Sequence, residues 1–415
     1  MNPVYNLGIS AYAAAVRLVK GRNRKARLML EGQAETLGRI RAAREGDDSE
    51  WIWIHAASLG EFEQGRPLIE LIKSECPELK VLLTFFSPSG FEVRKNYELA
   101  DCVAYLPFDK PRKVRAFLDA ARPSKAIFVK YEFWGNYLSE LHRRGIPTYL
   151  ISAIFRPSQS FFQWWGGTFR GMLKNYTKFY VQNDDSKRLL ASLGVENVEV
   201  TGDTRLDRVY DIMERAEPIP AVEVFKAGSE DPILIAGSTW PADEAILFPW
   251  LAKNPDVRSI IAPHEFDADR LAAMVKALGD RAVLLSEYER DPKACPDARH
   301  LVVDSFGRLA SIYRYGTIAY VGGGHGVGIH NINEAAVYGL PVGFGPNHHK
   351  FKEAADLIKL GGGFEIASVA DFERTLGRLL SDPEARARSG RASADYISRN
   401  RGATRRIYDE LFRRR

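Results

Sequence analysis

The sequence predicts an α/β protein built from two doubly wound domains, each a parallel sheet with helices on both faces. Short apolar runs alternate with amphipathic stretches of helical spacing along most of the 415 residues, which is typical of such sheets. A chain of this length is expected to form two or three domains. The alternation is interrupted once, where Pro218, Pro220, Gly228 and Pro232 indicate a linker.

The first domain is expected over residues 46–217 and the second over 232–400, with a linker at 218–231. The strands expected in the first domain are Trp51 to Ala56, Val81 to Phe86, Cys102 to Leu106, Ala126 to Lys130, Thr148 to Ser152, Lys178 to Gln182 and Val198 to Thr201. Those expected in the second are Ile233 to Ala236, Ser259 to Ala262, Ala282 to Leu285, His300 to Val303, Thr317 to Val321 and Pro341 to Phe344. Residues 401–415 form a basic C-terminal helix that could pack back across the first domain.

Composition and cysteine usage narrow the class of protein. With 45% hydrophobic and 27% charged residues, the chain resembles ordinary globular proteins. Its three cysteines, Cys76, Cys102 and Cys295, form no C-x-x-C pair. This spacing argues against a disulfide framework or a cysteine zinc site and favours a reducing cytoplasm.

Positive charge is concentrated at the two ends of the chain. Residues 1–45 hold nine Lys or Arg and three acidic residues, and residues 386–415 hold ten Arg and three acidic residues, so the body between them is acidic. This distribution disfavours nucleic acid as a partner and favours contact with an anionic surface. We interpret residues 1–45 as a basic, membrane-proximal segment.

Residues 4–19 are largely apolar, but a helix of this length falls short of the ~20 residues that span a bilayer. No small-residue cleavage site follows a basic start, so a secretory signal is not predicted. An interfacial anchor with the body in the cytoplasm is our interpretation. The alternative is an ordinary N-terminal helix with a solvated basic face.

A glycine cluster follows the expected strand that ends at Val321, and it leads into His330, Asn331, Asn333 and Glu334. Backbone N–H groups in such a loop bind phosphate. The dinucleotide fingerprint fails, since Val327, Ile329 and Asn331 occupy the possible third-glycine positions, and no Gly-Lys dipeptide exists for a P-loop. The cluster therefore points to a nucleotide sugar. Glu334 either accepts hydrogen bonds from ribose hydroxyls or stabilises the first helical turn.

Charged side chains follow strands of the first domain, at the edge where open parallel sheets bind ligands. Ser58 and Glu61 fit the S-x-x-E capping box, yet Glu61 is also placed to act as a general base. Glu132 follows a strand as well, and either serves the site or starts a helix. Arg205 is placed to face an anionic leaving group or is an ordinary surface arginine.

Metal-binding patterns are not found in the second domain. His264 and Glu265 begin H-E-F-D-A, and Ala268 stands where the zinc motif H-E-x-x-H has its second histidine. Asp267 and Asp269 are expected at a helix start. The first domain contains an aromatic run, Phe161, Phe162, Trp164 and Trp165. This run has two interpretations, core packing or an exposed patch near a membrane.

Taken in order, seven motifs resemble the 3-deoxy-D-manno-octulosonic acid (Kdo) transferases of lipopolysaccharide inner-core synthesis. They are H-A-A-S-L-G-E at 55–61, Y-E-F-W-G-N at 131–136, I-S-A-I-F-R at 151–156, G-D-T-R-L-D at 202–207, A-P-H-E at 262–265, D-S-F-G at 304–307 and H-N-I-N-E-A-A at 330–336. Each motif alone is weak, whereas seven in this order are specific.

The resemblance implies a GT-B glycosyltransferase, with two Rossmann-like domains facing a central cleft. It implies transfer of Kdo from CMP-Kdo to a lipid A precursor (lipid IVA) at the cytoplasmic face of the bacterial inner membrane, with inversion and without metal or other cofactor. Carried over to this sequence, Glu61 is the general base, and Glu132 and Arg205 stabilise the transition state. CMP would be bound by residues of three loops: Pro263, His264, Ser305, Phe306, Gly307, Asn331, Ile332, Asn333 and Glu334.

The sequence departs from the family pattern at three places. Pro263-His264 replaces Pro-Arg-His, Arg205 replaces a lysine, and residues 325–329 form an insert before the His-Asn pair. Two rival functions are another two-domain nucleotide-sugar enzyme, such as a UDP-sugar transferase or epimerase, and a non-catalytic protein that binds the membrane surface.

Overall fold

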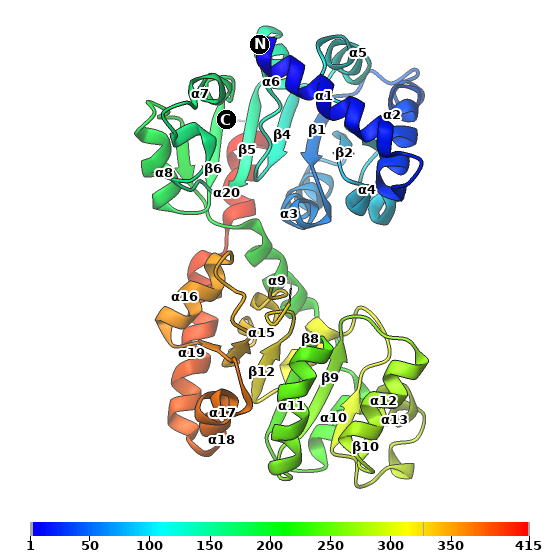
Figure 1. The fold of residues 1–415 in the computed structure, drawn as a ribbon, viewed down its shortest axis with the longest axis vertical. Coiled ribbons are helices and arrows are strands. Elements are labelled where there is room, and N and C mark those ends of the chain that lie inside the picture. The colour runs from blue at the N-terminus through cyan, green and yellow to red at the C-terminus, as the bar shows by residue number, and fades with distance from the viewer. Residues whose placement is uncertain (1–2, 327, 414–415) are drawn as a thin grey trace. The chain divides into compact units, whose positions relative to one another are not determined.

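The chain forms two compact units, unit 1 with residues Met1–Asp207 and Arg401–Arg415 and unit 2 with residues Arg208–Asn400 (Figure 1). This computed structural model describes residues 3–326 and 328–413. Val327 of the glycine cluster and the last two residues of the expected C-terminal helix lie outside the described residues.

The sheet of unit 1 has seven parallel strands in the order β3-β2-β1-β4-β5-β6-β7 within the described residues. These strands are β1 (Trp51–Ala56), β2 (Lys80–Phe85), β3 (Cys102–Tyr105), β4 (Lys125–Val129), β5 (Thr148–Ala153), β6 (Lys178–Val181) and β7 (Val198–Val200). The helices are α1 (Pro3–Val19), α2 (Arg24–Ala43), α3 (Leu59–Glu75), α4 (Pro88–Arg94), α5 (Pro111–Ala121), α6 (Gly135–Arg143), η1 (Ser160–Phe162), α7 (Gly167–Leu173), α8 (Asp184–Ala191), α9 (Thr204–Arg215), which continues into unit 2, and α20 (Ala403–Phe412).

Helices cover both faces of this sheet because its strands are largely apolar. Successive residues point to opposite faces, so both faces have apolar side chains to bury. Trp53 of β1 packs in one core, with Phe117 of α5 at 4.9 Å and Tyr137 of α6 at 5.5 Å between ring centroids. The neighbouring Ile54 belongs to the other core, together with Phe62 of α3. The expectation of a doubly wound parallel sheet is therefore confirmed.

The C-terminal helix α20 packs on α3 in unit 1 (Figure 1). The Asp207 carboxylate accepts hydrogen bonds from the backbone N–H groups of Gly402 and Thr404 where the chain enters this helix. The Tyr408 hydroxyl lies 3.1 Å from the Cys76 sulfur of the C-cap of α3. Residues of α3 and α20, with Cys76 and Tyr408 332 positions apart in sequence, thus complete one core.

The sheet of unit 2 also has seven parallel strands among the described residues, in the order β10-β11-β9-β8-β12-β13-β14. They are β8 (Ile233–Thr239), β9 (Arg258–Pro263), β10 (Ala282–Leu284), β11 (His300–Val302), β12 (Ile318–Val321), β13 (Val342–Phe344) and β14 (Gly363–Glu365). The helices are α10 (Pro220–Ala227), α11 (Pro241–Lys253), α12 (Ala268–Leu278), α13 (Leu285–Arg290), η2 (Pro292–Ala294), α14 (Leu309–Ile312), η3 (Tyr313–Tyr315), α15 (Asn333–Ala336), α16 (Lys352–Leu360), α17 (Val369–Phe372), η4 (Glu373–Gly377), α18 (Arg378–Ser381) and α19 (Pro383–Asn400).

The stretch expected as a linker, residues 218–231, contains helix α10. Phe225 of this helix is fully buried, and its carbonyl accepts a hydrogen bond from Arg258 of β9. The Ile219 N–H donates to the Tyr315 hydroxyl at 2.8 Å. Pro220 is therefore the first residue of a helix that packs in unit 2, and Pro218 and Pro232 lie outside its two ends.

The aromatic run divides between the two interpretations that the sequence left open. Phe161 is buried and Phe162 packs against the same core, whereas Trp164 is 91% and Trp165 52% exposed. Among the described residues, no helix combines the length and the apolar composition that crossing a membrane requires.

His300 of β11 makes the stability of unit 2 depend on pH. Burial, then Arg281 and Arg299, lower its pKa to about 4, and its Nδ1 lies 2.9 Å from the Ser259 hydroxyl. Because the pKa is lower in the folded state, the stabilisation is complete above the unfolded value near 6.5 and is lost as pH falls toward 4.

We predict that the free energy of unfolding falls by about 2 kcal/mol between pH 7 and pH 5 through this residue alone. His300→Asn should reduce the difference between the two pH values by that amount, measured by denaturant unfolding. His349→Asn, at an exposed position, is the control and should leave the pH difference unchanged. An equal pH dependence in the wild type and His300→Asn would contradict the prediction.

Candidate active site

The carboxyl edge of the unit 1 sheet brings together loops that follow β1, β4, β5 and β7. The last of these loops is drawn toward β1 by Thr204 at the start of α9. Its hydroxyl lies 2.8 Å from that of Ser152 in β5 and donates to the backbone carbonyl of Gln64 in α3. The Gln64 side chain in turn donates to Asp203 at 3.1 Å. Arg205 is therefore held near Gln64 of α3, although β7 is the strand at the other edge of the sheet from β3.

Glu61 lies in the first turn of α3, directly after β1, and is half-buried. The Ser58 hydroxyl donates to its carboxylate. Ser58 occupies the N-cap position, but its side chain makes no capping hydrogen bond to the helix backbone. The capping-box interpretation is wrong in that respect, because the serine hydroxyl binds the glutamate instead. The loop thus presents a carboxylate with one hydrogen bond from a neighbouring hydroxyl.

Glu132 follows β4, and its side chain is turned into the interior. It is 4% exposed, and one carboxylate oxygen lies 3.1 Å from His55 Nε2 and accepts from the Trp134 indole N–H. The Glu132 carboxylate is within ion-pair distance of His55 Nε2, but the two groups are not aligned for a hydrogen bond. On its other side, His55 Nδ1 lies 2.9 Å from the Thr84 hydroxyl of β2. His55 and Glu132 form a buried pair directly beneath the loops.

Arg205 is bound to Asp203 rather than standing alone. Its Nε and one terminal nitrogen donate to the same carboxylate oxygen at 3.0 and 2.6 Å, and its backbone N–H donates to the other at 3.0 Å. Burial acts to raise the pKa of Asp203, but the charge and hydrogen bonds of Arg205 and the bond from Gln64 hold it below its usual value. A permanent ion pair thus fixes the guanidinium.

Tyr131 and Arg156 belong to this group, although the sequence did not single them out as site residues. Arg156 Cζ lies 6.0 Å from the centre of the Tyr131 ring, and Lys130 Nζ lies 5.2 Å from it. Burial raises the pKa of Tyr131, while Arg156 and Arg205 lower it and Glu61 raises it. Charges of both signs thus act on the Tyr131 phenol. The sequence signal for both residues was that each lies in one of the seven motifs and follows an expected strand.

In unit 2, Asp243 of α11 joins the strand end of β8 to the glycine loop after β12. Its fully buried carboxylate accepts from the N–H groups of Trp240 at 2.9 Å and Gly323 at 3.0 Å, and from the Tyr320 hydroxyl at 2.9 Å. A Cβ on Gly322 would lie 2.3 Å from the Ser238 carbonyl oxygen, so only glycine allows this approach. Since β8 and β12 are neighbours, the loop lies at the point where the strand order reverses.

Three rings are stacked at this edge of unit 2. His264, after β9, lies 4.2 Å from His330 and 4.9 Å from Trp240 between ring centres. The Trp240 indole donates to His330 Nε2 at 3.1 Å. Burial, followed by the neighbouring His264, lowers the pKa of His330, so this ring accepts as neutral imidazole. Trp240 and His330 were not among the predicted binding residues.

The predicted nucleotide-binding residues divide into two groups. Asn331 accepts from the backbone N–H of Asn333 at 3.3 Å and donates to Glu334 Oε1 at 3.0 Å, next to the stacked His330. Ile332 is buried beneath them, and Pro263 is the last residue of β9. The second group follows β11, where Phe306, 76% exposed, stacks on Phe266 at 4.6 Å. Its neighbours in that loop are Ser305 and Gly307.

A model of the 3-deoxy-D-manno-octulosonic-acid transferase family (kdotransferase) matches residues 31–208, which include Glu61, Glu132 and Arg205. A 3-deoxy-D-manno-octulosonic acid transferase of Haemophilus influenzae is 28% identical over 378 residues, 87% of this chain and 86% of that protein. Over most of its length the chain is similar to Kdo transferases. It is therefore a glycosyltransferase.

Solved structures of enzymes with the GT-B fold are similar to this chain. UDP-GlcNAc 2-epimerase from Neisseria meningitidis has a TM-score of 0.61 at 14% identity, covering 88% of this chain and 100% of its own. Acinetobacter baumannii MurG has a TM-score of 0.55 at 12% identity, with the same coverage. At these identities the likeness concerns the fold alone, and the predicted fold class is confirmed.

Asp243 offers a direct test of how the glycine loop is held. Asp243→Asn replaces one acceptor oxygen by a donor, which would face the N–H groups of Trp240 and Gly323 or reverse the hydrogen bond with the Tyr320 hydroxyl. We predict a loss of about 1–3 kcal/mol in the free energy of unfolding, measured by denaturant titration. Asp269→Asn, an exposed site in the first turn of α12, should change it by less than about 0.5 kcal/mol. Equal effects of the two substitutions would contradict the assignment.

Proposed function

We propose that the protein transfers Kdo from CMP-Kdo to a lipid A precursor (lipid IVA), with inversion and without a metal ion. The observation that carries this proposal is the half-buried Glu61 carboxylate at the carboxyl edge of the unit 1 sheet, grouped with Arg156 and Arg205 around Tyr131 in a Kdo transferase. The coarser statement, Kdo transfer in lipopolysaccharide synthesis, comes from the family.

In the proposed step, Glu61 accepts the proton of an acceptor hydroxyl as the oxygen forms its bond to the anomeric carbon of Kdo. The bond from that carbon to the phosphate oxygen breaks, and CMP departs with the electron pair. A single displacement of this kind inverts the anomeric centre. The Ser58 hydroxyl, which already donates to Glu61, orients the carboxylate.

Stabilisation of the departing charge is assigned to Arg205, whose position is fixed by Asp203. Glu132 would contribute through His55, since its carboxylate lies against that ring and not toward solvent. The structure therefore favours a positioning role for Glu132 over direct contact with substrate. The single phosphate of CMP reduces the need for a metal ion relative to a diphosphate leaving group.

The cytidine monophosphate of the donor is assigned to unit 2. The rings of Trp240, His264 and His330 offer a polar and aromatic surface at the strand ends, and Asn331 and Glu334 lie beside it as hydrogen-bonding partners for a ribose. His264 occupies the position after Pro263 where relatives are expected to carry an arginine. A uridine diphosphate sugar is the second candidate donor, because UDP-GlcNAc 2-epimerase shares the fold.

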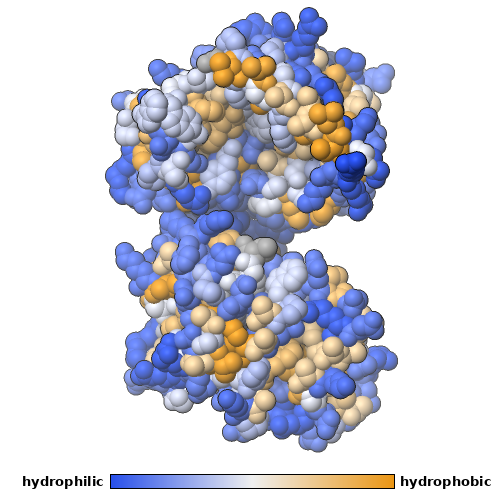
Figure 2. Space-filling view, in the orientation of Figure 1, coloured by the Kyte–Doolittle hydropathy of each residue, from blue (hydrophilic) through white to orange (hydrophobic). Residues whose placement is uncertain are grey.

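The proposed location is the cytoplasmic face of the bacterial inner membrane. Helix α1 exposes aliphatic side chains, with Leu7 at 71% and Leu18 at 85% exposure, and basic residues follow directly. Figure 2 shows apolar surface on the part of unit 1 that α1 crosses. Apolar side chains flanked by cations are typical of helices that lie in the membrane interface.

Glu61→Gln should lower kcat for Kdo transfer by about 10²–10⁴-fold while leaving the circular dichroism spectrum unchanged, because the amide cannot accept the proton. Transfer would be followed by mass spectrometry of the lipid product. Glu63→Gln, two residues further along α3 and paired with Arg94, is the control and should keep kcat within about threefold. Full activity of Glu61→Gln would remove the proposed base and favour a non-catalytic role for this loop.

Leu7→Ser with Leu18→Ser should reduce partition onto lipid vesicles by about tenfold or more, because each removes an aliphatic side chain from the interface. Sedimentation with the vesicles measures this. Val224→Ser, at a half-exposed site of unit 2, should leave partition unchanged. Unchanged partition of the α1 double variant would show that α1 does not attach the protein to membranes.

A further inference from the structure

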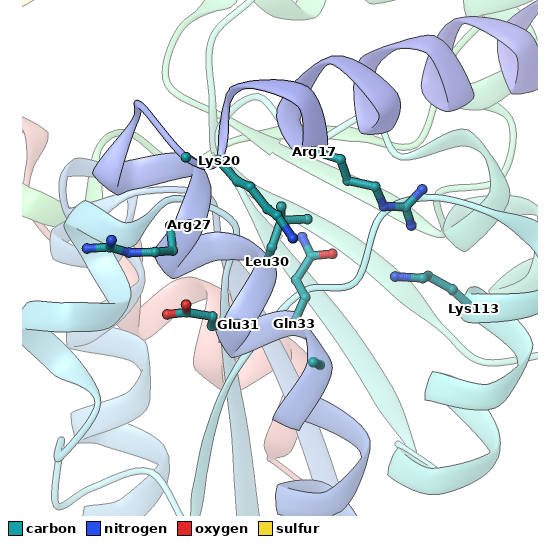
Figure 3. A pocket seen from close by; sticks show the side chains of 9 residues that line it. Arg17, Lys20, Arg27, Leu30, Glu31, Gln33 and Lys113 are labelled. Carbon is teal, nitrogen blue, oxygen red and sulfur yellow. The ribbon is translucent and has the colours of Figure 1, made fainter.

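A basic cavity of about 590 Å³ lies between α1, the turn after it, α2 and α5 (Figure 3). Four cations line it, Arg17, Lys20, Arg27 and Lys113, against one acid, Glu31. Within residues 3–326 and 328–413, none of the four cations forms an ion pair. Such an uncompensated cluster repels itself, so an anion bound among the cations would remove a cost that the free protein bears.

Gln33 provides a second and independent sign of a ligand. Its side chain is 94% buried, being 6% exposed, and lines the cavity. Gln33 Oε1 accepts from the Phe108 N–H at 3.2 Å, while Nε2 has no hydrogen-bond partner among the described residues. In Figure 3 this amide points into the same space as Lys20 and Lys113. A buried donor without an acceptor is costly unless a ligand supplies one.

The chemistry of these groups selects a phosphate. Arginine and lysine side chains with an amide N–H match an oxyanion that accepts several hydrogen bonds at once. Burial lowers the pKa of Lys113, and the charges of Arg17 and Lys110 lower it further. A phosphate among them would oppose the effect of the neighbouring cations.

The surroundings indicate a lipid rather than a dissolved ion. Leu18 is 85% and Val19 46% exposed, and both stand between Arg17 and Lys20 in the sequence. Exposed apolar side chains next in sequence to cations that line the cavity are suited to a molecule whose acyl chains leave the phosphate directly.

We propose that the cavity between α1, α2 and α5 is a binding site for the phosphate headgroup of an anionic membrane phospholipid. The site goes beyond the transfer reaction, because it needs neither donor nor acceptor and is formed by residues outside the loops of Glu61 and Arg205. It would set the position of unit 1 on the membrane surface through one specific headgroup, in addition to any general attraction of the basic segment.

The test compares two pairs of substitutions that remove the same charge from neighbouring positions. Arg17→Ala with Lys113→Ala removes two of the four cations that line the cavity, whereas Arg22→Ala with Arg24→Ala removes exposed cations that do not line it. Flotation with vesicles of phosphatidylglycerol and phosphatidylcholine at physiological salt measures the affinity. We expect the first pair to weaken binding roughly tenfold more than the second, since general attraction would affect both alike. Equal weakening by the two pairs would overturn the proposal.

Gln33→Glu is a second test of the site. The variant keeps an acceptor for the Phe108 N–H, and it replaces the unpaired N–H donor by a carboxylate oxygen that would repel a phosphate. Binding to the same vesicles should fall by about tenfold, with thermal unfolding recorded to show that the variant is folded. Inorganic phosphate is the probe for the other source of this chemistry. Strong competition by millimolar inorganic phosphate against vesicle binding would overturn the assignment to a lipid, and unchanged vesicle binding by folded Gln33→Glu would overturn the site.

Discussion

The parallel arrangement of every strand is the constraint on which the rest of the structure depends. Because seven carboxyl ends meet at one edge of each sheet, the polar groups of loops far apart in sequence are brought together there. In unit 1 this edge receives Glu61, Tyr131, Arg156 and Arg205 from four different loops. The same constraint in unit 2 stacks His264 from the loop after β9 on His330 from the loop after β12.

Buried and half-buried carboxylates hold these loops in place, and each accepts several hydrogen bonds. Asp243 accepts three hydrogen bonds that connect α11, β12 and the glycine loop. Asp203 fixes Arg205, and Asp207 holds the start of α20. A buried carboxylate is unfavourable unless several donors surround it, so each of them specifies one loop conformation. The geometry of these loops thus depends on carboxylates that bind neighbouring backbone and side-chain groups.

Much of this architecture could be predicted from the sequence, because buried parallel strands are continuous apolar runs. The β1 strand was predicted with its exact ends, and twelve others within a few residues. Strand β14 was missed because its three residues, Gly363–Glu365, carry no apolar run. Helix α10 was taken for a linker because its prolines, which begin a helix in this context, also punctuate loops.

The site was less predictable, since side-chain partners depend on contacts between distant segments. Nothing local to Glu132 shows that its carboxylate turns inward to His55, and the pairing of Ser58 with Glu61 replaces the capping box that their spacing suggests. Trp240 was missed as a partner of His330 because the two are 90 positions apart. Seven ordered motifs identified the family, and they could not identify these contacts.

The central claim, that this GT-B enzyme uses CMP-Kdo and no diphosphate sugar, is tested most directly by offering both donors at once. Purified protein would be incubated in detergent and chelator with CMP-Kdo, UDP-GlcNAc and a tetraacylated lipid A precursor. The mass of the lipid product would be measured by mass spectrometry. The predicted product carries Kdo and no N-acetylhexosamine. A lipid that gains N-acetylhexosamine, or UDP-GlcNAc that is epimerised while the lipid stays unchanged, would contradict the claim.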